Sequence, residues 1–75
     1  CWHVQVAASA ERVKAERYLE AGRSQLLAPL QIEAERGLFK VRTRDCLSGS
    51  AADGLRRRAL DAGFDGTFRF RGRKP

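Results

Sequence analysis

The 75 residues suffice for one small domain with a single core, which we expect to span residues 1–75, and no apolar run approaches the roughly 18 residues that cross a bilayer. The net charge is +6, and its excess lies in residues 36–75, which hold eleven Lys and Arg against four Asp and Glu. Such a field attracts nucleic acid, acidic lipid or another polyanion, but it does not choose among them.

The first predicted element is a strand over residues 2–7. Apolar and polar side chains alternate there, as they do in a strand with one buried face. The side that we expect to meet the core carries Trp2, Val4 and Val6, and the opposite side carries Cys1, His3 and Gln5.

A helix is predicted to begin near Ser9 or Ala10, because Ser9 can cap it and Glu11 would lie at the positive end of its dipole. Gly22 can end a helix or be tolerated within one. We expect the helix to continue to about Leu26, since Pro29 then stops it. The residues at core spacing are Ala15, Tyr18, Leu19, Gly22 and Leu26.

Residues 30–34 and 38–43 alternate again and are joined by Glu35-Arg36-Gly37, which predicts two strands in a hairpin. In the second of these strands one side carries Phe39, Val41 and Thr43, and the other carries Leu38, Lys40 and Arg42.

A second helix is predicted to begin at Ser50, where Ser50-Ala51-Ala52-Asp53 fits a capping box, and to end at Gly63. Phe64 can fold back onto its end. The buried stripe of this helix is predicted to be Ala52, Leu55, Ala59 and Ala62.

Residues 67–71 form the last predicted strand, and its alternation allows two orientations. Either Phe68 and Phe70 face the helices while Arg69 and Arg71 face outward, or the reverse. The preference of aromatic residues for the interior favours the phenylalanines inside.

These elements are two strand-helix-strand units. Two right-handed crossovers that interleave give an α+β, ferredoxin-like βαββαβ fold. The fold has a four-stranded antiparallel sheet, spatial order 4-1-3-2, with both helices on one face. The other face is then exposed, and its central strands carry His3, Gln5, Leu38, Lys40 and Arg42.

Neither catalysis nor metal binding is indicated by the residues. The chain has one histidine and no Ser/His/Asp set, so we expect no enzyme activity and no cofactor. Two cysteines and one histidine without paired C-x-x-C spacing do not predict a metal site. In the predicted sheet Cys1 and Cys46 come close enough for a disulfide, which would indicate an oxidising compartment; the alternative is two free thiols.

The exposed sheet face allows several functions. An RNA-binding face would carry aromatic residues on its central strands, and this one lacks them, which makes nucleic acid an improbable ligand there. A carbohydrate-binding face needs amide, ammonium or guanidinium hydrogen bonds beside apolar surface, which Gln5, Lys40, Arg42 and Leu38 can provide. The same pattern is also compatible with a face that binds another protein, and with a solvated face that binds no ligand.

Several short motifs occur in a familiar order. They are Val4-Gln5-Val6-Ala7-Ala8-Ser9, Ala15-Glu16, Gly37-Leu38-Phe39-Lys40-Val41-Arg42-Thr43, Ala52-Asp53-Gly54-Leu55 and Ala62-Gly63-Phe64. Over about residues 2–71 the chain resembles the SPOR domain, a sporulation-related repeat at the C-terminal end of many bacterial cell-division and cell-wall-remodelling proteins. Two departures stand out. Arg44-Asp45-Cys46 replaces the usual Gly-Pro and aromatic residue, and Ala8-Ser9 replaces the usual Ser-Phe.

The resemblance implies a non-catalytic module of a larger envelope protein. Its sheet face would bind septal peptidoglycan glycan strands stripped of stem peptides, in the periplasm or cell envelope at the division septum. Gln5, Leu38, Lys40 and Phe68 match the family's binding positions, and Arg42 lies beside them. For Phe68 this conflicts with the inward orientation favoured for the phenylalanines of the last strand. We expect a monomer that recognises glycan; the alternative is an electrostatic binder of nucleic acid or anionic polymer through the basic second half.

Overall fold

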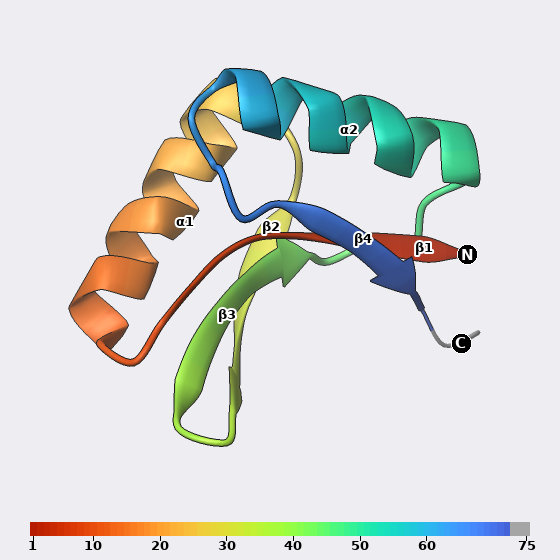
Figure 1. Cartoon of the computed structure of the whole chain (residues 1–75). Coiled ribbons are helices and arrows are strands. Elements are labelled where there is room, and N and C mark those ends of the chain that lie inside the picture. Colours follow the sequence, from red (N-terminus) through yellow and green to blue (C-terminus); the bar gives the residue numbers. More distant parts are fainter. Residues whose placement is uncertain (73–75) are drawn as a thin grey trace.

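A computed structural model describes residues 1–72 and places six elements in the order βαββαβ. This order is the one that the sequence predicted (Figure 1). Their bounds are β1 Trp2–Ser9, α1 Arg12–Leu26, β2 Leu30–Glu35, β3 Leu38–Thr43, α2 Gly49–Asp61 and β4 Phe68–Arg71.

The strands form one antiparallel sheet in the order β2-β3-β1-β4, so the predicted fold class and strand order are confirmed. α1 packs on β1, β2 and β3, and α2 packs on β1 and β4. In Figure 1 the two helices lie on the same side of the sheet. The arrangement follows from right-handed crossovers, which return each helix to the same face.

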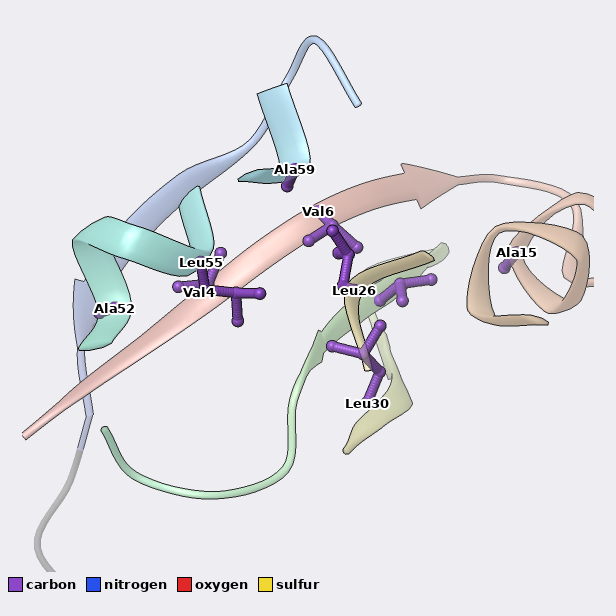
Figure 2. Close-up of a cluster of buried hydrophobic side chains, with 9 residues drawn as sticks. Val4, Val6, Ala15, Leu26, Leu30, Ala52, Leu55 and Ala59 are labelled. Carbon is purple, nitrogen blue, oxygen red and sulfur yellow. The ribbon is translucent and has the colours of Figure 1, made fainter. Parts of the chain in front are cut away.

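The core lies between the helices and β1. Val4 and Val6 project from β1 toward Leu55 and Ala59 of α2, Ala15 of α1, and Leu26 and Leu30 (Figure 2). The alanines allow the helix backbones to approach the sheet closely, so a short chain can still fill its interior.

Two members of the predicted helix stripes lie outside this core. Tyr18 is exposed because α1 turns that position toward the edge of the sheet, and Ala62 is exposed because α2 has already ended before it. The other α2 positions, Ala52, Leu55 and Ala59, are buried as predicted.

Both helices begin at positions other than those predicted. Ser9 remains in β1, where it pairs with Phe39, so α1 begins at Arg12 after Glu11. Ser9 Oγ still accepts a hydrogen bond from the Glu11 N–H at 3.0 Å. In α2 the cap is Ser48 rather than Ser50, because Ser48 Oγ accepts from the Ala51 N–H at 3.1 Å.

The predicted hairpin and the predicted end of α1 are confirmed, whereas α2 ends at Asp61, before the predicted Gly63. Arg36 and Gly37 both have positive φ, 51° and 79°, as the two central residues of a tight hairpin turn require. α1 ends at Leu26, with Leu27 in the left-handed region and its N–H bonded to the Arg23 carbonyl. After α2, Gly63 has a φ of 97° and the Phe64 N–H donates to the Ala59 carbonyl at 2.9 Å.

The preferred orientation of the last strand was wrong. Phe70 pairs with His3 and Phe68 with Gln5, so both phenylalanines lie on the face away from the helices. The helix side of β4 carries Arg69 and Arg71, whose guanidinium carbons lie 4.4 and 4.7 Å from the centre of the Trp2 ring. Trp2 thus gives the two arginines an aromatic surface to pack on while their charges reach water.

We predict that Gly22→Ala destabilises the domain although alanine is the better helix former. A methyl group there would lie 2.6 Å from Cδ1 of the buried Leu30, and overpacking of this kind costs about 1–3 kcal/mol. Gly54→Ala in α2 is the matched control, because nothing lies within 4 Å of the added carbon. It should raise the free energy of unfolding by up to about 1 kcal/mol. Urea unfolding measures both, and stabilisation by Gly22→Ala would contradict the packing described.

Candidate functional site: the open face of the sheet

The face of the sheet away from the helices, here called the open face, is the candidate site. Strand register defines its membership, since residues that pair across the sheet share a face. Its members are His3, Gln5 and Ala8 of β1, Gln31, Glu33 and Glu35 of β2, Leu38, Lys40 and Arg42 of β3, and Phe68 and Phe70 of β4.

All five residues predicted to bind glycan lie on the open face. Phe68, Gln5 and Arg42 form one row across β4, β1 and β3, which Gln31 of β2 completes. Leu38 and Phe68 are exposed, whereas Gln5 is buried among its neighbours. The side chains of Leu38 and Phe68 are therefore accessible to a ligand, whereas the Gln5 side chain lies beneath the surface of the face.

Arg42 is the centre of the hydrogen bonding on this face. Its Nε donates to Gln5 Oε1 at 2.7 Å and its Nη1 donates to Glu33 Oε1 at 3.0 Å. Its guanidinium carbon lies 4.6 Å from the centre of the Phe70 ring. Side chains from the three other strands thus contact this one planar group.

Lys40 is held in a similar way. Its Nζ donates to Glu35 Oε1 at 2.6 Å across the β2–β3 hairpin. The hydrogen bond from Lys40 and its positive charge keep the pKa of Glu35 below the usual value of a glutamate. A glutamate is ionised at neutral pH in any case, so Glu35 balances the charge of Lys40 there.

Phe70 and Glu33 also lie on the open face, where the sequence analysis did not place them. The His3 and Phe70 rings stack with centroids 5.7 Å apart, and Phe68 lies 6.0 Å from Phe70. Glu33 accepts from Arg42 and also from Gln31 Nε2 at 3.0 Å. Side chains alternate between the two faces of a strand, so placing Phe68 outward would also have placed Phe70 outward. The register of the β2–β3 hairpin would likewise have placed Glu33 on this face.

A cleft of about 340 Å³ adjoins the open face at the edge of the sheet. β4 pairs with β1 only over Trp2 to Gln5, while β1 continues to Ser9, so the edge of β1 is uncovered beyond Gln5. The cleft is lined by Gln5, Val6, Ala7, Ala8, Tyr18, Gly63, Phe64, Asp65 and Gly66. It extends the accessible surface beyond the start of β4 at Phe68.

Comparison with solved structures places this arrangement among known folds. The crystal structure of the RlpA SPOR domain from Pseudomonas aeruginosa superposes with a TM-score of 0.76 at 23% sequence identity, covering 96% of this chain and 100% of that one. The chain has the SPOR-domain fold. No protein-family model matches the sequence, and no curated protein matches it either.

In this chain a disulfide closes the loop that follows β3. Cys1 and Cys46 are bonded, with their Cα atoms 5.5 Å apart. Beside them, Trp2 and Leu47 exchange two backbone hydrogen bonds of 2.7 Å. These contacts occur where the sequence has Arg44-Asp45-Cys46 instead of the usual Gly-Pro motif, so the loop is fastened to the first strand directly.

His3 lies close to the disulfide. One of its ring nitrogens and the two sulfurs lie within 4.8 Å of one another, and Nδ1 lies 3.1 Å from the Thr43 carbonyl oxygen. Metal ligation requires thiolates, and bonded sulfurs are not thiolates. The disulfide and His3 therefore connect β1 to the end of β3 at one end of the open face.

Neither α1 nor α2 is long and apolar enough to cross a membrane.

We predict that the disulfide contributes a large share of the stability of this SPOR fold. It closes a loop over a sequence separation of 45 residues, and loop-closure entropy for such a length is worth about 4 kcal/mol. Reduction should lower the urea midpoint of unfolding strongly. The variant with both Cys1→Ser and Cys46→Ser should have the same midpoint as the reduced protein, and adding reductant should not change it. Two thiols that react with an alkylating agent in the untreated folded protein would contradict the bond.

Proposed function

We propose that this SPOR-like domain is a non-catalytic module that binds peptidoglycan through its open face, recognising glycan strands from which the stem peptides have been removed. The single observation that carries the proposal is the combination on that face of exposed apolar side chains with hydrogen-bonding side chains that are held in place by their neighbours. Leu38 and Phe68 provide the first, and Gln5, Lys40 and Arg42 provide the second.

Sugar rings present C–H surfaces and hydroxyl groups, and they need both kinds of partner. Phe68 gives a ring face to the C–H surface of a sugar, at the start of β4 beside the cleft. Lys40 and Arg42 have more N–H donors than their bonds to glutamate use, and the carboxylates of Glu33 and Glu35 can accept from hydroxyl groups. A glycan strand can therefore bind without these pairs being broken.

The stripped strand fits this face better than an intact one. The proposed contacts lie on the open face of the sheet and along its edge cleft, so a strand must approach closely along its length. Stem peptides would hold the sugars away from Phe68 and Leu38. The affinity should be modest, because shallow polar contacts compete with water.

We also propose where in the cell the domain acts and what kind of protein contains it. The Cys1–Cys46 bond fits an oxidising compartment, which supports the periplasm or cell envelope, and peptide-free glycan supports the division septum within it. The domain would act as the targeting module of a larger envelope protein. The charge balance of Lys40 and Arg42 argues against the electrostatic alternative, since it leaves no unbalanced cation of β3 for a polyanion on this face.

Phe68→Ala should weaken binding to amidase-treated sacculi by about fivefold, the equivalent of roughly 1 kcal/mol of lost apolar contact. Co-sedimentation with treated and intact sacculi measures this. Val13→Ala on α1 is the matched control, because Val13 is 60% exposed and Phe68 44%. Its binding should equal that of the wild type.

The salt dependence of the same assay separates glycan from polyanion binding. Pelleting should change little between about 50 and 200 mM salt, whereas phosphate contacts would weaken it steeply. Equal losses for Phe68→Ala and Val13→Ala, or a steep salt dependence, would contradict the proposal.

A further inference from the structure

The open face is electrically balanced although the domain carries a net charge of +6. Its two cations, Lys40 and Arg42, lie 2.6 and 3.0 Å from the carboxylates of Glu35 and Glu33. Because positive residues are in excess in this chain, an uncompensated pair of cations here would form part of a basic field. Glu33 and Glu35 of β2 neutralise these two positive charges.

The glutamates also lie outside the cations they balance. The side chains of Lys40 and Arg42 are 17% and 15% exposed, whereas those of Glu35 and Glu33 are 51% and 38% exposed. An anionic ligand approaching the sheet therefore meets carboxylate before it meets ammonium or guanidinium. Repulsion at short range costs binding energy that a neutral ligand does not lose.

Strand pairing keeps these carboxylates in place. β2 is bonded along its whole length to β3, so Glu33 and Glu35 remain tethered beside the cations at a high effective concentration. Gln31 Nε2 donates to Glu33 Oε2 at 3.0 Å and fixes that side chain further. A phosphate group would have to displace a tethered competitor at each cation.

We propose that Glu33 and Glu35 are specificity-determining residues that exclude dense polyanions from the open face while leaving it accessible to a glycan. The identity of the favoured ligand rests on the function proposed above. Nucleic acid and polyphosphate carry a charge on every repeat unit, whereas a peptide-stripped glycan carries one carboxylate for each disaccharide. Selection against the denser polymer arises from a repulsive element as well as from attractive contacts to the glycan.

The test replaces both carboxylates by isosteric amides, Glu33→Gln with Glu35→Gln, and measures binding of a fluorescent single-stranded DNA of about 20 nucleotides by anisotropy. At about 50 mM salt the variant should bind at least tenfold more tightly than the wild type, because two cations become available to phosphate. Its logarithmic salt slope should become steeper by about 1.4, the value for two additional phosphate contacts on a single strand.

The matched control is Glu16→Gln with Glu20→Gln on α1. It makes the same change in net charge through two exposed glutamates that pair with Arg12 and Arg23 of the same helix. DNA affinity should rise no more than about twofold, by the general effect of charge alone. Equal gains in the two double variants, or no gain on the open face, would overturn the proposal.

A further variant and a second ligand make the result decisive. Glu35→Gln alone leaves the Arg42 network intact and should give an intermediate gain, so a folding defect in the double variant does not decide the outcome. Sedimentation of wild type and Gln5→Ala with amidase-treated sacculi is run in parallel. Failure of the wild type to pellet would remove the proposed function, whereas the DNA measurements decide the role of the glutamates independently.

Discussion

The packing of both helices against one side of β1 is the constraint on which the rest of this structure depends. Val4 and Val6 are buried beneath the helices, and the strand period then places His3 and Gln5 on the opposite side. A chain of this length covers only one face of a four-stranded sheet with its helices. The other face must be stabilised by its own side chains, and it is the face through which we propose that the domain binds glycan.

Hydrogen bonding between strands provides that stabilisation. Arg42 joins β1, β2 and the Phe70 ring of β4, and Lys40 joins β3 to the end of β2. These bonds keep long side chains flat against the sheet, so the surface stays accessible while its charges are balanced. The same arrangement serves the architecture and, in the function proposed here, the choice of ligand.

Alternation and crossover handedness were enough to predict the topology, the hairpin and the outward positions of β1 and β3. The orientation of β4 could not be predicted in this way, because Phe68 and Arg69 fit either face by alternation. The contacts of Arg69 and Arg71 with the Trp2 ring join residues far apart in the sequence, which local pattern does not reveal. The cleft depends on β4 being shorter than β1, and strand ends are poorly encoded by local pattern. The pairing of Glu33 with Arg42 rather than with Lys40, its partner in register, depends on side-chain reach.

The most direct test of the central claim is nuclear magnetic resonance of the isotope-labelled domain during addition of soluble, peptide-free glycan strands. Binding through the open face predicts shifts of the Gln5 side-chain amide and of the backbone amides of Leu38, Arg42 and Phe68, with α1 unchanged. Shifts confined to α1 or to the arginines of α2, or no shifts at high glycan concentration, would contradict it.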